Sequence, residues 1–291
     1  MEERFAQPER PGAKYVFWGI GVREGFNNEK VALKKGNISE VFNDGKVVYR
    51  DLKPQSISVH RLLLHLEEKG IGFTPRFLGI NEDNMEMLSF VEGDTIDDYP
   101  IQNEISKKIT TVRMAAEMLR KFHDGTVDFI QNPDDIWFLE YKGELQKEVI
   151  CHNDFAPYNV TFQDLKPVGL IDFDTACPAP RIWDVAYAAY RFVPLSGEVY
   201  DINTRQYRRY SKSTDSLERK LLLHEFLDSY GMKNNAEVLQ TLILRLQDLV
   251  LLFDEECKKG SEPFIKMKES GHQQFYIREI TFIKENMADW I

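Results

Sequence analysis

The sequence predicts an α+β fold, with a small antiparallel sheet followed by a mainly helical region. Short β-branched and aromatic runs, separated by turn residues, recur between 31 and 91. Apolar residues return at helical spacing in 104–123 and in most of the chain after 216. Between these regions, 151–174 combines two short apolar runs with several aspartates and asparagines. A chain of 291 residues is long enough for one large domain or two lobes.

The composition is that of an ordinary globular protein, with 43% hydrophobic and 29% charged residues. A formal net charge of −10 argues against nucleic acid or an anionic membrane as the main partner, and it is compatible with a cationic substrate. The three cysteines at 151, 177 and 257 are too few and too scattered for a disulfide framework. Because we also find no signal peptide or membrane-spanning run, we expect a protein of a reducing compartment, the cytoplasm.

The first strands of the sheet are predicted at 31–33, 41–42 and 46–50, and the Asn-Asp-Gly sequence between the last two is a strong hairpin signal. The turn between the first two contains Gly36 and Asn37. A loop of this kind can expose backbone N–H groups to phosphates, although a plain hairpin turn explains the same residues equally well.

A helix is predicted at 58–69, because its apolar residues share one face. Ser58 is expected to be its N-cap, and Gly70 is expected to end it. Two more strands are predicted at 75–80 and 85–91.

The helical region is predicted to begin after a linker at 93–102, which carries three aspartates and a proline. An amphipathic helix at 104–123 follows. After the acidic stretch, further helices are expected at 217–230, 236–258 and 272–291.

A second hairpin is predicted inside the acidic stretch. Its strands are expected at 160–162 and 168–171, with Lys166 and Pro167 in the turn. Both strands are apolar, so we expect the polar residues at the open end of the hairpin to border a buried core.

In this register Val160 lies opposite Ile171, so that Asn159 falls opposite Asp172, and Asp154 lies on the loop just before. Mg²⁺ prefers oxygen ligands, few of them from protein and the rest from water and phosphates. Phosphoryl transfer also needs a carboxylate that orients the attacking hydroxyl. The pattern therefore favours a magnesium-nucleotide site.

The stretch H-N-D-F-A-P-Y-N at 152–159, followed by L-I-D-F-D at 170–174, resembles the aminoglycoside phosphotransferase and choline kinase superfamily. The flanking F-H-D-G-T at 122–126 and the W-D-V-A-Y-A-A-Y run within 181–194 agree with this resemblance. The likeness extends from about 36 to 194. This superfamily is the small-molecule branch of the protein-kinase-like fold.

The resemblance implies a two-lobed protein-kinase-like fold, with an extension at 1–25, a nucleotide-binding N-lobe at 26–92 and a helical catalytic and substrate-binding C-lobe at 93–291. It also implies transfer of the γ-phosphoryl group of ATP or GTP, with Mg²⁺, to a hydroxyl group of a small molecule. An aminoglycoside, a choline-like amine, a macrolide and a metabolite alcohol all remain open as acceptors. The oligomeric state is open as well.

The resemblance also implies roles for single residues. Asp154 would be the catalytic carboxylate, and Asn159 and Asp172 would hold Mg²⁺. Further implied positions are Gly36 and Asn37 over the phosphates, the hinge residues Ser89, Phe90 and Val91 against the purine, and His152 and Asp184 in support of the catalytic loop. Asp174 is a ligand of a second metal ion, a contact of the substrate or a plain turn residue, and these alternatives stay open. Asp184 can equally be a helix N-cap.

One position departs from the superfamily pattern. Related kinases carry a lysine on the third strand that contacts phosphate, and a helix glutamate that pairs with it. Here Arg50 takes the strand position, and the helix offers only Val59 or His60 at the matching place. The usual ion pair is therefore absent or rebuilt, and Lys46 or Lys53 are alternatives to the arginine.

A catalytically silent nucleotide-binding module of the same fold is the alternative function. The missing lysine–glutamate pair favours it, and the complete polar set around Asp154 favours an enzyme. A protein kinase fits less well, since the Asp-Phe-Gly and Ala-Pro-Glu signatures are missing. Four acidic residues of the later helices are either acceptor contacts or solvated helix faces: Asp248, Asp254, Glu255 and Glu256.

Overall fold

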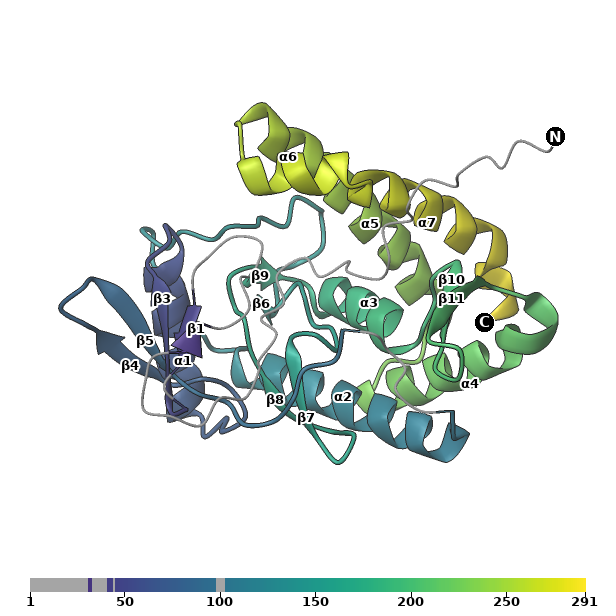
Figure 1. The fold of residues 1–291 in the computed structure, drawn as a ribbon, viewed down its shortest axis with the longest axis horizontal. Coiled ribbons are helices and arrows are strands. Elements are labelled where there is room, and N and C mark those ends of the chain that lie inside the picture. The colour runs from purple at the N-terminus through teal and green to yellow at the C-terminus, as the bar shows by residue number, and fades with distance from the viewer. Residues whose placement is uncertain (1–30, 33–40, 44, 98–102) are drawn as a thin grey trace, which may run out of the picture.

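The computed structural model describes residues 31–32, 41–43, 45–97 and 103–291. A small sheet with one helix lies at one end of the molecule, and a larger helical part lies at the other (Figure 1). The predicted α+β class is confirmed. The predicted extension at 1–25 lies outside the described residues, as do Gly36 and Asn37 of the predicted phosphate loop.

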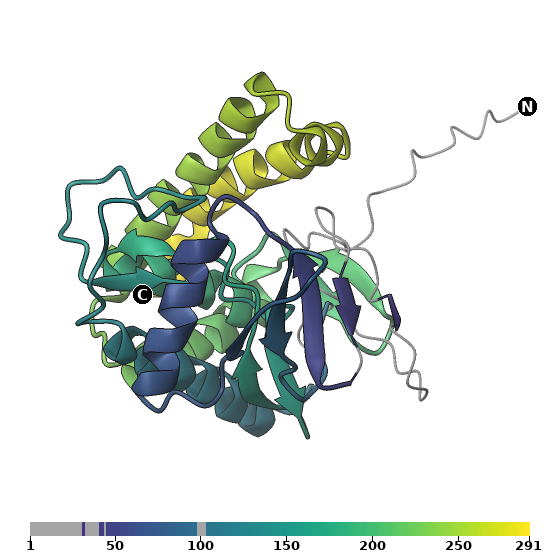
Figure 2. The same ribbon diagram turned by 90° about the vertical axis from the view of Figure 1, so that its left-hand side faces the viewer.

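The small lobe is a five-stranded antiparallel sheet in the order β1-β2-β3-β5-β4, with α1 running beside it (Figure 2). Its elements are β1 (Val31–Ala32), β2 (Val41–Asn43), β3 (Val47–Asp51), α1 (Ser56–Glu68), β4 (Phe77–Ile80) and β5 (Met85–Ser89). Helix α1 buries Val59, Leu62, Leu63 and Leu66 against the rest of the protein, as its apolar spacing predicts.

The start of α1 differs from the prediction. The helix begins two residues earlier, and Gln55 rather than Ser58 is its N-cap. Ser58 is buried instead, and its Oγ accepts a hydrogen bond from the backbone N–H of Ile136 at 2.8 Å. The helix ends just before Gly70, as predicted, because the φ of +73° at that position suits glycine.

The large lobe is mainly helical. Its helices are α2 (Ile105–Gly125), α3 (Arg181–Phe192), α4 (Lys212–Tyr230), α5 (Asn235–Lys258), α6 (Glu262–Glu269), α7 (His272–Asn286) and the 3₁₀ helix η1 (Met287–Asp289). Helix α2 packs on α4, while α5 packs on both α3 and α7. In the described ranges we find no helix that is both long and apolar enough to cross a membrane.

Among the elements of this lobe that were not predicted are a short helix and an exposed hairpin. One is α6, a short helix between α5 and α7. The other is a hairpin of β10 (Glu198–Asp201) and β11 (Gln206–Arg209). Every residue of β11 is exposed, so its sequence lacks the alternation of apolar and polar residues that marks a half-buried strand.

Two short antiparallel pairs carry the acidic stretch. They are β6 (Val149–Cys151) with β9 (Cys177–Ala179), and β7 (Val160–Gln163) with β8 (Lys166–Leu170). Because Cys151 lies opposite Cys177, the loop that follows β6 and the loop that precedes β9 meet this strand pair at the same end.

The predicted register of the second pair is wrong by one residue. Val160 lies opposite Leu170, and the N–H of Ile171 donates to the carbonyl oxygen of Asn159 at 2.9 Å. Asn159 is therefore next to Ile171 rather than opposite Asp172. The two metal-ligand candidates still share the open end of the hairpin.

The turn explains this shift. Asp164 and Leu165, with φ values of 48° and 64°, form a two-residue turn that is typical of tight hairpins. Lys166 and Pro167, predicted as the turn, belong to β8, and a bulge at Val168 of β8 alters the pairing further along. Proline is a common turn residue, but here it occupies a position that does not need to donate a hydrogen bond.

The segment that leaves the small lobe is tied to this hairpin. Asp94 and Phe162 exchange two backbone hydrogen bonds of 3.0 and 2.9 Å. Gly93, just before them, has a φ of +110°, and a Cβ atom there would lie 2.9 Å from the Phe162 carbonyl oxygen. Glycine is required at this position because both the conformation and the space exclude a side chain.

Candidate active site

Asp154, the predicted catalytic carboxylate, is buried on the loop that follows β6. Its Oδ1 accepts a hydrogen bond from the Tyr158 hydroxyl at 2.6 Å, and its Oδ2 accepts one from Asn159 Nδ2 at 2.9 Å. Burial raises the pKa of Asp154 to about 6 in spite of these hydrogen bonds. The carboxylate is held in one orientation and is mostly ionised at neutral pH.

Asp184 lies on α3 beneath this loop, and Pro180 rather than Asp184 is the N-cap of that helix. Its oxygens accept the backbone N–H groups of His152 at 2.7 Å and Asn153 at 2.9 Å, and His123 Nε2 lies 3.1 Å away. Burial favours the neutral acid, but these partners outweigh burial and hold the pKa of Asp184 below its ordinary value. The contacts are those of a loop anchor, while its effect on activity stays a prediction.

His152 links the two halves of the acidic stretch. Its Nε2 lies 3.0 Å from the carbonyl oxygen of Ile171, and its Nδ1 lies 3.3 Å from the N–H of Asp154. This geometry fits a neutral ring that donates from Nε2 and accepts at Nδ1. Burial lowers the pKa of His152, in agreement with a neutral ring.

The two predicted magnesium ligands present oxygen atoms that the protein leaves without hydrogen bonds. Oδ1 of Asn159 and Oδ1 of Asp172 are buried and have no hydrogen-bond partner among the described residues. Buried polar atoms are almost always paired, so two such oxygens at one hairpin end suggest a ligand. Burial and the nearby Asp174 raise the pKa of Asp172 to about 7. A hard cation that prefers oxygen fits this donor set.

Arg50 on β3 lies among three carboxylates. Its Nη2 is 2.7 Å from Glu86 Oε1 and 3.1 Å from Asp174 Oδ1, and its Nη1 is 3.5 Å from Asp172 Oδ1. Burial opposes the charge of Arg50, but these carboxylates outweigh it and raise its pKa. Lys53 Nζ reaches Asp174 Oδ2 at 2.5 Å. Asp174 is thus already engaged by two cations, which hold its pKa low although burial acts to raise it.

The ion pair that the helix lacks is rebuilt from the sheet. Glu86 is the residue of β5 directly opposite Arg50, and it is fully buried. On its other oxygen it meets His60 of α1 at 2.5 Å. The sequence reasoning missed Glu86, although alternation along β5 places it on the same buried face as Leu88. A charged residue on an apolar face is the signal that could have revealed it.

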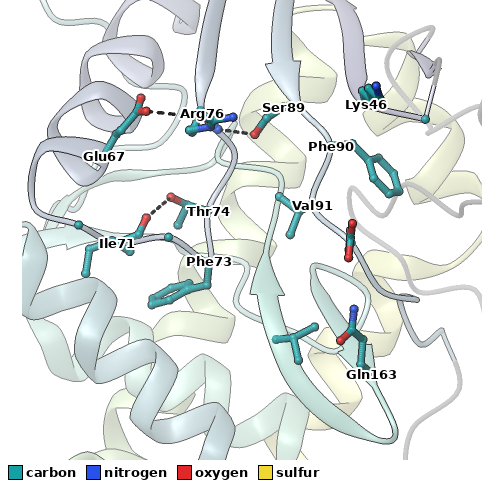
Figure 3. A pocket seen from close by; sticks show the side chains of 15 residues that line it. Lys46, Glu67, Ile71, Phe73, Thr74, Arg76, Ser89, Phe90, Val91 and Gln163 are labelled. Atoms are coloured by element: carbon teal, nitrogen blue, oxygen red, sulfur yellow. Dashed lines mark hydrogen bonds and ion pairs between the residues drawn. The ribbon is translucent and has the colours of Figure 1, made fainter.

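The predicted hinge residues line a pocket of about 670 Å³. Figure 3 shows this pocket between the hinge and the turn that follows α1. Residues 70–74 and Gln163 also line it, whereas the metal and catalytic candidates do not. The N–H groups of Ser89 and Phe90 already donate to the carbonyl oxygens of Arg76 and Lys46. Of the three hinge N–H groups, that of Val91 is the one without an acceptor among the described residues.

A second, much smaller cavity lies beside Asp154. It measures about 10 Å³, enough for one water-sized group. Its charged lining residues are Asp154 and Arg245 of α5. The prediction missed Arg245, although it falls on the apolar face of its helix between the buried Leu242 and Leu249.

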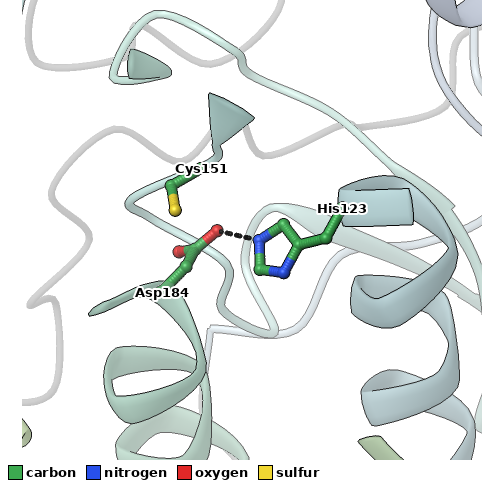
Figure 4. Close-up of side chains that lie close together, drawn as sticks. All are labelled: His123, Cys151 and Asp184. Atoms are coloured by element: carbon green, nitrogen blue, oxygen red, sulfur yellow. Dashed lines mark hydrogen bonds and ion pairs between the residues drawn. The ribbon is translucent and has the colours of Figure 1, made fainter. Parts of the chain in front are cut away.

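Three buried groups near the catalytic loop lie close enough to hold a metal ion: His123, Cys151 and Asp184 (Figure 4). Their bonds argue against that use. Both nitrogens of His123 are hydrogen-bonded, one to Asp184 and one to Tyr230. Burial raises the pKa of the Cys151 thiol well above its usual value, so the thiolate that a metal needs is disfavoured.

Comparison with known proteins adds a family match and a relative. Residues 134–219 match the phosphotransferase enzyme family. The trifolitoxin immunity protein of Rhizobium leguminosarum bv. trifolii is 32% identical over 210 residues, which cover 70% of this chain and 75% of that protein.

Solved structures show the same fold at low sequence identity. The gentamicin complex of APH(2″)-IIa has a TM-score of 0.53 at 15% identity, covering 90% of this chain and 93% of that one. An ethanolamine kinase of Plasmodium vivax has a TM-score of 0.52 at 13% identity, covering 87% and 81%. The predicted two-lobed kinase-like fold is thereby confirmed.

Proposed function

This chain belongs to the phosphotransferase enzyme family, as its motifs predicted, and we propose that it transfers the γ-phosphoryl group of ATP or GTP to a hydroxyl group of a small molecule. One observation carries this proposal. A buried, oriented carboxylate at Asp154 lies beside two buried oxygens, on Asn159 and Asp172, that lack hydrogen bonds.

Asp154 would position the acceptor hydroxyl and accept its proton as the oxygen attacks phosphorus. Tyr158 and Asn159 hold the carboxylate still, which lowers the cost of orientation during the reaction. Asp184 and His152 fix the loop on which Asp154 lies. A pKa of about 6 leaves Asp154 ionised and able to take a proton at neutral pH.

Asn159 and Asp172 would hold Mg²⁺, which would neutralise the phosphate oxygens when bound. Arg50 would contact phosphate with its fork while Glu86 fixes its direction. Val91 would offer its N–H to the purine, since the other two hinge N–H groups are occupied.

A silent nucleotide-binding module is supported less well than an enzyme. Its main support was the missing ion pair, and Arg50 with Glu86 supplies one. The relative from Rhizobium leguminosarum is an immunity protein, which supports a role in protecting a cell by phosphorylating a toxic molecule.

Nucleotide turnover by the purified protein tests this proposal. ATP and GTP would be supplied with and without Mg²⁺, and with aminoglycosides, macrolides and amino alcohols as acceptors. The proteins compared are wild type, Asp154→Ala and the exposed hairpin variant Asp164→Ala. Metal-dependent turnover that persists in Asp164→Ala and disappears in Asp154→Ala supports the proposal. Nucleotide binding without turnover under any acceptor would favour the silent module, and equal turnover in all three proteins would remove Asp154 from its role.

A further inference from the structure

Two arginines lie close to the proposed catalytic carboxylate. Arg245 lines the small cavity with Asp154, and its Nη2 donates to the backbone oxygen of Asn153 at 3.0 Å. Arg191 of α3 lies over the ring of Tyr158, the residue that hydrogen-bonds Asp154. The charges of both arginines act on Asp154 and partly offset the effect of burial on its pKa.

Neither guanidinium has a carboxylate partner within 4 Å in the described parts of the chain. Besides its hydrogen bond to Asn153, Arg245 lies 5.3 Å from the Tyr187 ring centroid and 5.6 Å from that of Trp183. Arg245 is buried, and its Nε has no hydrogen-bond partner among the described residues. The Nε atom of Arg191 is buried and unpartnered in the same way. A buried donor without a partner is costly, so an acceptor atom from a ligand would complete it.

Three of the acidic residues of α5 are engaged by lysines. Asp254, Glu255 and Glu256 are paired with Lys268 at 2.7 Å, Lys142 at 3.1 Å and Lys259 at 2.6 Å. Asp248 is half-buried one turn after Arg245; burial raises its pKa, while the charge of Arg245 acts to lower it, so Asp248 offsets part of the arginine's charge. Asp248 forms no ion pair within 4 Å among the described residues and does not line the cavity. The cavity therefore presents one guanidinium beside the carboxylate that the reaction would use.

We infer that the acceptor is a hydroxyl compound whose carboxylate, or an equivalent anionic oxygen, lies against Arg245, and that Arg245 selects against cationic acceptors. This inference rests on the proposed function. Arginine suits the task because its fork binds anionic oxygens directionally and its charge is permanent. The cavity beside Asp154 has room for one water-sized group, so one anionic oxygen rather than a whole carboxylate group would enter it.

The test uses acceptors that share a scaffold and differ in charge. Ethanolamine, ethylene glycol and glycolate form one set, and glucosamine, glucose and glucuronate form a larger set. Acceptor-stimulated nucleotide loss and the melting temperature of the magnesium-nucleotide complex would be measured at pH 7.5 for each compound. We expect the anionic member to act at a concentration roughly 10- to 100-fold lower than the cationic member.

Arg245→Gln should remove this preference by raising the KM of the anionic member more than the KM of the neutral member. Because Arg245 also holds the catalytic loop, Arg191→Gln serves as a second variant, and it should weaken the preference without loss of folding. The exposed Arg278→Gln is the matched control and should keep the wild-type preference.

A preference for the cationic members, a preference unchanged in both variants, or no action by any member would overturn the inference. Magnesium-dependent nucleotide turnover that requires Asp154 would still stand in each case. If that turnover is itself missing, the proposed function fails, and the melting temperatures still show whether anions bind through Arg245.

Discussion

The two ends of the proposed reaction centre are charged in opposite ways. At the phosphate end, Arg50 and Lys53 lie among the three carboxylates of Glu86, Asp172 and Asp174. At the acceptor end, Arg191 and Arg245 lie near Asp154 and form no ion pair within 4 Å with any carboxylate described, although Arg245 also acts on Asp248.

The first end has a surplus of negative charge and suits a bound cation. At the second, Arg245 lines the acceptor cavity and its Nε lacks a hydrogen-bond partner among the described residues, which suits an anion. The net charge of −10 describes neither end, so the charge of a whole chain is a poor guide to the substrate of one site.

The largest effect is expected at the acceptor end. Asp154→Asn should lower the phosphoryl-transfer rate by about 10²- to 10⁴-fold, because the amide cannot take the hydroxyl proton. Nucleotide affinity should stay close to wild type, since the hydrogen bond from Asn159 is the side-chain contact that links Asp154 to the phosphate end. Single-turnover rates and nucleotide titrations would measure the two quantities. Asp164→Asn in the exposed turn is the control. If Asp154→Asn loses nucleotide binding and the control does not, the two ends do not act separately.

The phosphate end should respond to Glu86→Gln mainly in stability. Removing one partner from a buried ion pair leaves Arg50 with less compensation and should cost about 3–5 kcal/mol of unfolding free energy. Urea denaturation would measure this loss, and nucleotide affinity should fall with it. The exposed Glu82→Gln, in the turn between β4 and β5, should change neither. A neutral outcome for Glu86→Gln would mean that Arg50 is held by the two aspartates alone.

Asp184 anchors the catalytic loop, and its contribution to stability is expected to be lost in acid. The folded pKa of Asp184 is depressed, so its stabilisation is present above its ordinary pKa and is lost as pH falls through the folded value. Asp184→Asn should lower the unfolding free energy by about 1–3 kcal/mol at pH 7, and the difference from wild type should shrink below about pH 4. Denaturation at several pH values checks this, and a difference that grows in acid would show the opposite sign.

Lys53→Met should have the smallest effect. Lys53 is partly exposed, and Asp174 keeps its contact with Arg50 after the change. We expect a loss of about 1 kcal/mol in stability and less than a tenfold loss of nucleotide affinity. A loss as large as that of Glu86→Gln would instead make Lys53 the principal cation of this end.

The structure brings together the predicted site residues that are close in sequence, while their roles stay predictions. Asp154, Asn159 and Asp172 belong to one loop and one hairpin, so their proximity follows from local pairing even though the register was wrong by one residue. The turn at Asp164 and Leu165 was missed because neither residue is glycine, the usual choice for positive φ.

The rest of the site depends on packing between distant elements. Glu86 meets Arg50 only because β5 pairs with β3 in one particular register. Arg245 reaches the catalytic loop only because α5 packs against α3. Local patterns gave the strand and the helix correctly, but nothing in them states which partner each element will have.

The phosphate end draws on both lobes, because Arg50 and Lys53 of the small lobe meet Asp172 and Asp174 of the large lobe. The chain passes between the lobes through the segment after β5. Because Asp94 is bonded to Phe162 on both sides of its peptide, the large lobe extends as far as Asp94. Phe90 N–H is bonded to Lys46, so the small lobe extends as far as Phe90. Along this connection Val91, Glu92 and Gly93 are the residues between the two anchors, so rotations at these three would accompany any opening or closing of the lobes. Such a motion would also have to break the hydrogen bond from the N–H of Leu170 to the carbonyl oxygen of Phe73, which ties the turn after α1 to the large lobe.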